Sequence, residues 1–141
     1  MSEEKKNPFV SAVTDTADQT DTMDKNDVDN NKFMGVLAYL FILVLIPIFA
    51  AKNSKFARFH ANQGLVLCII GCAHQIISAF TAFITTIISK IPVINILCLI
   101  IDISMSLIGI LLLVYAILGI VYVVQGKAKD LPFIGGIKIL K

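Results

Sequence analysis

The sequence has little charge, and long stretches of it have none. Charged residues make up 16% of the 141 residues, whereas 57% are hydrophobic, and the mean hydropathy is +0.83. A net charge of +2 is too small to indicate a nucleic-acid partner. Ordinary globular packing would leave far too much apolar surface exposed, so the composition predicts a membrane protein.

Several features of catalytic and metal-binding proteins are also missing. No nucleophile and base occur at a suitable spacing, and there is no phosphate-binding glycine loop. Cys68, Cys72 and His74 form a C-x3-C-x-H pattern, but a fourth nearby ligand is lacking and the pattern falls within an apolar run. Three cysteines cannot all pair, so we expect reduced thiols. The sequence therefore predicts no enzyme, no metal site and no cofactor.

The N-terminal part lacks a cleavable signal, because the first apolar run begins only at Phe33. Residues 1–31 instead hold eight of the ten acidic side chains and almost no apolar residue that a core could bury. Such a composition is typical of a disordered segment. We expect a disordered acidic tail over residues 1–31 and a helical membrane domain over residues 32–141, whose first helix directs insertion.

Three apolar runs are each longer than the roughly 18 residues that mark a spanning helix. Because about 20 residues cross the hydrocarbon layer, we expect spanning helices over about 33–51, 64–86 and 103–125. The predicted fold class is an all-α membrane protein with three transmembrane helices, or four.

The residues left between the second and third spans, 87–102, are apolar but contain Lys90, Pro92, Asn95 and Asp102. This mixture favours a re-entrant or interfacial segment. A helix that continues from about Ile96 into a strongly tilted third span is the alternative that the sequence leaves open.

Lysine and arginine concentrate in the loop after the first run and in the tail of residues 126–141. By the positive-inside rule, both segments lie in the cytoplasm. The number of spans is then odd, which favours three spans, with the acidic tail outside the cell (inner or plasma) membrane.

Small or weakly polar side chains recur every three or four residues along the second and third spans, which predicts a helix-packing face. Its main members are Gly71, Gln75, Ser78, Gly109 and Gly119. His74 and Gln75 fall near the bilayer midplane, where polar groups need a partner. We expect a hydrogen bond from His74 to Ser78, or from Gln75 to a neighbouring backbone group, and a pairing of Asp102 with Lys90; a proton or substrate relay is the alternative.

Three stretches, KFMGVLAYL, KNSKFARFHANQG and LGIVYVVQGKAKDLPFIGGIKIL, occur in this order between residues 32 and 140. In this they resemble a prokaryotic family of small multi-pass membrane proteins that is similar to the twenty-kilodalton subunit of the chloroplast inner-envelope import translocon. The resemblance covers about residues 31–141 and implies a role near a protein-conducting path. The plastid members are usually drawn with four helices, so a channel role does not transfer directly.

The most specific stretch, RFHANQG, and the tail element GKAKDLPFIGG are both predicted to be cytoplasmic. We expect them to dock and form one interaction patch, in which Asp130 pairs with Arg58. The patch comprises Arg58, His60, Asn62, Gln63, Gly64, Lys127, Lys129 and Asp130.

The expected function is that of a noncatalytic integral membrane protein, a component or accessory of a transport or protein-translocation assembly. The alternative is a stand-alone membrane module, such as a stress or immunity protein that binds one target. Expected partners are membrane lipids and a protein in the membrane, and the sequence leaves a homo-oligomer open.

Overall fold

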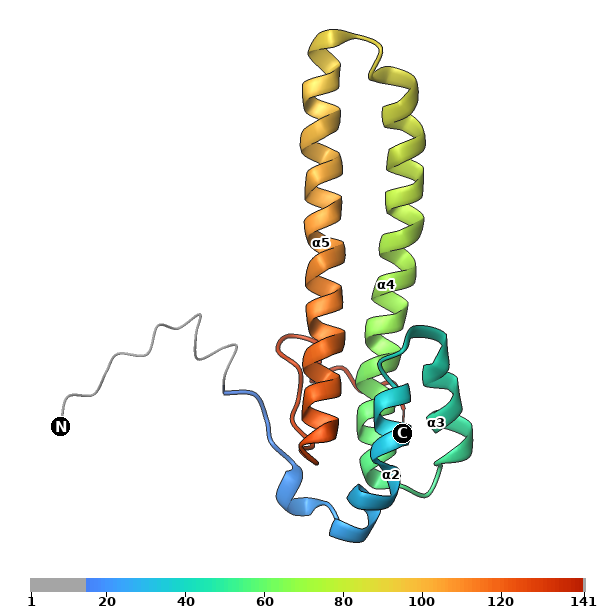
Figure 1. Ribbon diagram of the computed structural model, residues 1–141, viewed down its shortest axis with the longest axis vertical. Helices are drawn as coiled ribbons and strands as arrows, with labels where there is room; N and C mark the ends of the chain where they lie inside the picture. Colours follow the sequence, from blue (N-terminus) through green and yellow to red (C-terminus); the bar gives the residue numbers. More distant parts are fainter. Residues whose placement is uncertain (1–14, 141) are drawn as a thin grey trace, which may run out of the picture.

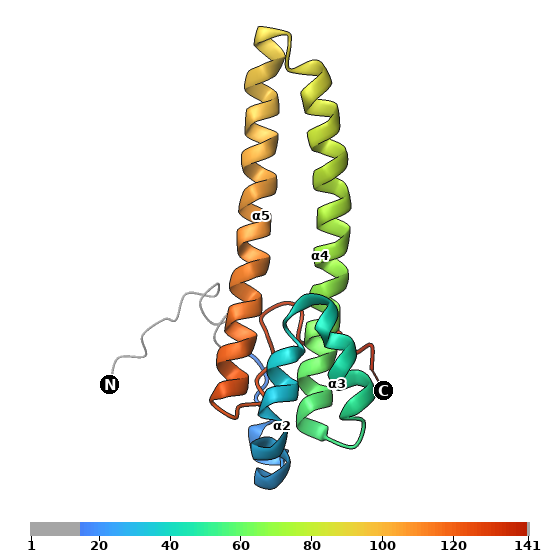
Figure 2. The ribbon, with the colours of Figure 1, turned by 45° about the vertical axis from the view of Figure 1, so that its right-hand side comes forward.

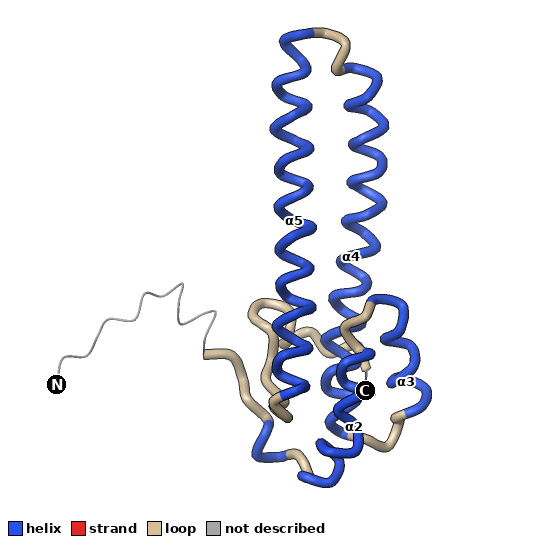
Figure 3. The backbone as a smooth tube through the Cα atoms, in the orientation of Figure 1, coloured by secondary structure: helices blue, strands red, loops and turns tan. Residues whose placement is uncertain are grey.

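The computed structural model describes residues 15–140 and contains helices joined by short loops (Figure 1). In chain order its elements are the 3₁₀ helix η1 (Thr20–Thr22), α2 (Lys25–Leu37), the 3₁₀ helix η2 (Phe41–Val44), α3 (Leu45–Ala50), α4 (Lys55–Ile88) and α5 (Pro92–Val124). Within the described range, extended pairing is confined to one isolated bridge, and Figure 3 accordingly shows helices and loops. The predicted all-α class is confirmed.

The two long helices α4 and α5 form an antiparallel hairpin (Figures 1 and 2). Helix α4 starts where the Ser54 side chain caps it, since Ser54 Oγ accepts a hydrogen bond from the Ala57 amide at 2.9 Å. Helix α5 starts with Pro92 in its first turn, where a missing N–H costs nothing. Both helices are long and apolar enough to cross a membrane.

Residues 67–116, the end of α4 and most of α5, project away from the rest of the chain (Figure 1). From here on, the term hairpin means these residues only. Its large apolar side chains are exposed: Ile76 and Val93, for example, keep 72% and 76% of their surface. The core helix of a soluble protein would bury such residues. The exposed surface therefore needs an apolar environment that the chain itself does not provide.

Residues 15–66 and 117–140 form a packed unit, called the base below. There α2 and α3 lie against the lower part of α4, and the chain after α5 folds back onto the same helices (Figure 2). The core is apolar and includes Val28, Ala38, Tyr39, Val44, Phe56, Ala61, Val123, Ala128 and Leu131.

The predicted first span, residues 33–51, is not one helix. Helix α2 ends at Leu37, the chain reverses at Phe41, which has φ +53°, and η2 and α3 run back beside α2 (Figure 1). The break lies between Leu37 and Phe41, and Pro47 occupies the first turn of α3, where a proline is tolerated. This apolar run therefore folds back on itself, and the two helices that are long enough to cross a membrane are α4 and α5 rather than the expected helix over 33–51.

The segment 87–102 is not a separate re-entrant piece either. A short turn over residues 89–91 follows α4, and residues 92–102 are the first turns of α5. This continuous helix is the alternative that the sequence left open. The predicted interfacial segment is wrong because a helix accommodates all of its polar residues: Pro92 stands in the first turn of α5, and Asn95 and Asp102 follow within the same helix.

The acidic tail is ordered from residue 15 onward, while residues 1–14 lie outside the described residues. The Gln19 amide donates to the Ala128 carbonyl, and the Asp130 amide donates to the Ala17 carbonyl, both at 2.8 Å. Residues 17–19 thus pair with residues 128–130, so both segments lie on the same side of any bilayer that the helices cross. An even number of crossings separates them, which contradicts a three-span fold with the tail outside.

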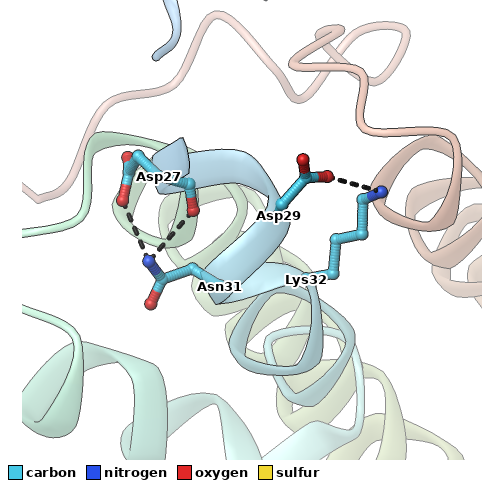
Figure 4. A network of polar contacts seen from close by, with 4 residues as sticks. All are labelled: Asp27, Asp29, Asn31 and Lys32. Carbon is cyan, nitrogen blue, oxygen red and sulfur yellow. Dashed lines mark hydrogen bonds and ion pairs between the residues drawn. The ribbon is translucent and has the colours of Figure 1, made fainter. Parts of the chain in front are cut away.

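Acidic residues of this tail have structural roles that composition hides. Asp24 caps α2 by accepting from the Asn26 amide at 3.0 Å. Asp27 holds the Asn31 side chain and also accepts from the Phe56 amide in the first turn of α4, at 3.0 Å. Figure 4 shows Asp27 with Asn31 and the neighbouring ion pair of Asp29 and Lys32. A carboxylate at the N-terminus of a helix is stabilised there, so Asp27 ties α2 to α4.

Candidate functional site

The stretch RFHANQG forms the second and third turns of α4 and lies inside the base. His60 and Gln63 are 0% and 1% exposed, Asn62 is 8% exposed, and Gly64 is buried. These residues are therefore not a surface that another protein could contact. They bind the chain after α5, so the expected docking of the two segments is observed as an intramolecular contact.

His60 links three parts of the chain. Its Nε2–H donates to the Lys127 carbonyl at 3.0 Å, since a carbonyl can only accept. Its Nδ1 then accepts from the Tyr39 hydroxyl, also at 3.0 Å. Both ring nitrogens are thus used, and the imidazole is neutral with the proton on Nε2.

Gln63, one turn further along α4, forms hydrogen bonds with residues 129–131 of the C-terminal segment. Its Oε1 accepts from the Leu131 amide at 3.0 Å, and its Nε2 donates to Asp130 Oδ1 at 3.1 Å and to the Lys129 carbonyl at 3.4 Å. A buried amide with these partners leaves no costly unpaired polar group.

Asn62 binds the end of the C-terminal segment in the same way. Its Nδ2 donates to the Ile137 carbonyl at 2.6 Å, while its Oδ1 accepts from the Ile139 and Leu140 amides at 2.6 and 2.9 Å. Three polar side chains within about one turn of α4, His60, Asn62 and Gln63, thus satisfy the backbone of a segment that has no regular secondary structure.

The expected pairing of Arg58 with Asp130 is wrong. Asp130 instead receives the Gln63 amide, and Arg58 reaches the Lys52 carbonyl at 3.5 Å. Both side chains line the same small cavity of about 140 Å³. Lys127 and Lys129 contribute mainly through their carbonyl groups, although the Lys129 ammonium also lies 6.0 Å from the Tyr122 ring.

Two glycines allow the turn between α2 and η2 to approach the long helices. A Cβ built at Gly64 would overlap the Ala38 carbonyl, and one built at Gly119 would overlap the Tyr39 ring. The predicted role of Gly119 in packing one span against the other is therefore replaced by a contact with Tyr39. Gly71 likewise faces Phe41, whereas Gly109 lies opposite His74 and so does sit between α4 and α5.

The surroundings of His60 oppose its protonation. The rings of Phe56, Phe59 and Tyr39 lie with their centroids 4.7, 5.2 and 5.8 Å from that of His60. Burial lowers the pKa of His60 to about 4, although the hydrogen bond to Lys127 acts in the opposite direction. Burial raises the pKa of Asp130, an effect reduced by Lys138 and by the Gln63 amide.

We expect acid to destabilise the base. An unfolded histidine binds a proton below about pH 6.5, but folded His60 does so only near pH 4. Its contribution is therefore present above pH 6.5 and lost as the pH falls to 4, by roughly 3 kcal/mol in free energy of unfolding. Asp130 acts with the opposite sign, since its raised pKa favours the fold at low pH, and it is less buried. Circular dichroism and limited proteolysis in detergent micelles, followed from pH 7 to 4, measure the change.

His60→Gln is the control for this titration. Glutamine can donate and accept as the neutral imidazole does but does not titrate, so the variant should be less stable at pH 7 yet lose the decline between pH 6.5 and 4. An unchanged decline in this variant would assign the acid effect to another group.

A second polar region lies in the hairpin, between α4 and α5. An upper cavity of about 520 Å³ is lined in part by Gln75, Ser78, Asp102, Ser106 and Gly109. A lower one of about 370 Å³ adjoins it and reaches Tyr39, Phe41 and Gly71. His74, Gln75, Gly109 and Leu113 line both, so the two form one groove along the hairpin, called the groove below.

The polar residues of the groove have other partners than expected. His74 Nε2 donates to the Met105 carbonyl of α5 at 3.0 Å rather than to Ser78. Lys90 and Asp102 form no ion pair among the residues that the structure describes. Because α5 is continuous, Asp102 instead lines the same groove as His74.

No family model, curated protein or solved structure matches this chain. The resemblance to the translocon-related family therefore stays a prediction based on the three sequence stretches.

The sequence analysis did not predict the hydrogen bonds of Tyr39 with His60 and of Asp27 with the Phe56 amide. It also did not predict the pairing of residues 17–19 with residues 128–130. A signal for α2 was present, because Asp24 and Asp27 stand three residues apart in the manner of a helix cap. No comparable signal existed for Tyr39, whose role depends on the chain reversal after α2.

Proposed function

We propose that this chain is a noncatalytic protein of the cell membrane that crosses the bilayer twice. Residues 67–88 and 92–116 would rise about 33 and 37 Å, which matches a hydrocarbon layer of about 30 Å. The exposed apolar side chains of the hairpin would then face lipid. The turn at residues 89–91 would lie at the far surface and the base at the near one.

The distribution of basic residues supports a cytoplasmic base. Among the residues that the structure describes, every lysine and arginine except Lys90 belongs to the base; they are Lys25, Lys32, Lys52, Lys55, Arg58, Lys127, Lys129 and Lys138. Such an excess is typical of the cytoplasmic side. The two-span arrangement also places Lys25 and Lys32 on this side, together with the other basic residues of the base.

The base favours a structural role over a catalytic one. His60 is fully buried, both of its nitrogens are engaged within the chain, and Tyr39 beside it is also buried. A general base needs access to a substrate proton, which this imidazole lacks. Lys52, Lys55 and Arg58 border an open depression of about 450 Å³ on the base and are suited to contact lipid headgroups.

We further propose that the chain is a component or accessory of a transport or protein-translocation assembly. One observation carries this proposal: the groove gathers exposed polar side chains, Gln75, Asp102 and Ser106, on a hairpin whose exposed surface is mostly apolar. Polar groups at membrane depth are costly unless another element covers them. A protein that works alone in lipid would have no reason to keep them exposed.

Copurification in mild detergent from native membranes tests this role. We expect a subunit of a transporter or translocase to copurify with the wild-type chain and with Lys90→Gln, but not with Asp102→Asn. If no such subunit is retained by any variant and a deletion strain shows one specific sensitivity, the chain is a stand-alone membrane module instead.

A further inference from the structure

The groove contains a carboxyl group without a counterion. Asp102 is exposed toward the groove, and the ion pair found among the described residues joins Asp29 and Lys32 instead. Across the groove, α4 contributes His74, Gln75 and Ser78, and the Nε2 of His74 is occupied by the Met105 carbonyl. Among the residues that the structure describes, no lysine or arginine therefore pairs with Asp102.

The position of Asp102 along the hairpin makes this unfavourable. It follows Pro92 by ten residues, so it lies about 15 Å from the turn at residues 89–91. Residues beside the turn, such as Ile91 and Val93, are apolar and 54% and 76% exposed, so the turn cannot extend far into water. Asp102 then lies near the middle of a hydrocarbon layer about 30 Å thick. Ser78, ten residues before the end of α4, lies at the same depth.

The walls of the groove allow a helix to come close at this depth. Ser78 and Ala82 on α4 and Ser106 and Gly109 on α5 are small and border the same cavity of about 520 Å³. Small residues let helix backbones approach each other in lipid, and serine hydroxyls can bond across the contact. Phe41 closes the lower end of the groove, where the hairpin meets the base.

Charge decides which helix can occupy the groove. Between residues 59 and 126, Lys90 is the only lysine or arginine, and it stands at the turn. A second copy packed through the same groove would therefore bring a second Asp102 and no cation to the midplane. Like charges in that position repel, whereas a lysine or arginine would supply the missing partner.

We propose that the groove binds a transmembrane helix of another protein, and that this helix carries a lysine or arginine near its centre that pairs with Asp102. This inference rests on the two-span membrane arrangement proposed above. It adds the identity of the contact: one helix, seated between α4 and α5, with its basic residue about 15 Å from either surface.

Synthetic peptides can represent such a helix. The full chain, with Cys68, Cys72 and Cys98 replaced by alanine and a donor dye at Gly136→Cys, is placed in phosphatidylcholine vesicles. Leucine- and alanine-rich peptides of about 21 residues carry an acceptor dye and either a central lysine, a central leucine or a lysine near one end. We expect energy transfer to show roughly tenfold tighter binding of the central-lysine peptide than of the other two.

Asp102→Asn should remove this preference, while Lys90→Gln, which changes charge at the turn, should leave it intact. Asp102→Lys should reverse it in favour of a peptide with a central aspartate. Equal binding of the lysine and leucine peptides to the wild-type chain would overturn the inference. Asp102-dependent energy transfer between two labelled copies of the chain would also overturn it, by assigning the groove to a second copy.

The same vesicles separate this inference from the function on which it rests. A cysteine at Lys90, probed with an impermeant maleimide, reports whether the turn reaches the side opposite the base. If the turn and the base are labelled from one side, the membrane-spanning proposal itself fails. If they are labelled from opposite sides and the peptides show no preference, only the basic partner helix is excluded.

Discussion

Cysteines introduced at Asp21, Asn53 and Gly136 will react with an impermeant maleimide from one side of the membrane, and a cysteine at Lys90 will react from the other. Asp21 and Gly136 should react from the same side because residues 17–19 pair with residues 128–130, which keeps the N-terminal and C-terminal segments together. The loop at Asn53 joins them because the chain turns back between α2 and α3, so that Asn53 lies with the base. The expected effect is close to all or nothing at each position.

The measurement uses inside-out and right-side-out vesicles of a chain without its own cysteines. Labelling of Asp21, Asn53 and Gly136 only in inside-out vesicles would support the cytoplasmic base. If Asp21 and Gly136 were labelled from opposite sides, an odd number of spans would be correct and the observed pairing would not exist in the membrane. Labelling of the base only in right-side-out vesicles would keep two spans but reverse their orientation.

Gly64→Ala will destabilise the base by about 3 kcal/mol or unfold it, because the new methyl group overlaps the Ala38 carbonyl. A backbone oxygen cannot rotate away as a side chain can, and Tyr39 next to it is held by His60. Thermal unfolding in micelles, together with the release of residues 127–140 to protease, measures the loss.

Gly71→Ala is the matched control on the same helix. A Cβ at this position would meet Phe41 Cε2 at 3.6 Å, an ordinary contact. Alanine is also favoured over glycine in a helix by up to about 1 kcal/mol, so this variant should be as stable as the wild type or slightly more stable. Equal stability of both variants would show that the turn after Leu37 does not press against α4 as described.

The long apolar helices could be predicted from the sequence because their signal is local. Residues 61–89 and 91–124 are apolar over more than the length of a bilayer, and no tertiary contact is needed to keep them helical. The region 33–51 has a similar composition but a different structure. Its course depends on the reversal at Phe41 and on the contact of Ala38 with Gly64, which hydropathy does not register.

The candidate site was predicted in part for the same reason. The dense polar stretch from Arg58 to Gly64 identified the residues that matter and the tail segment that they contact. Their roles were misjudged, because polar residues next to an apolar run suggest a surface. In the structure the C-terminal segment covers these residues and forms hydrogen bonds with them, so Asn62 and Gln63 are buried inside the base and hold that segment in place.

The sequence by itself determined that this protein is helical, that it is too apolar for water and that its basic residues gather away from one turn. These properties follow from composition and periodicity, which act on each segment separately. Only the tertiary structure decided how many segments are long enough to cross a bilayer, and that Asp102 lines the groove with His74 and has no ion partner among the described residues. Those features depend on which distant residues meet, and the contacts of Tyr39, His60 and residues 128–130 are made between segments that no local pattern connects.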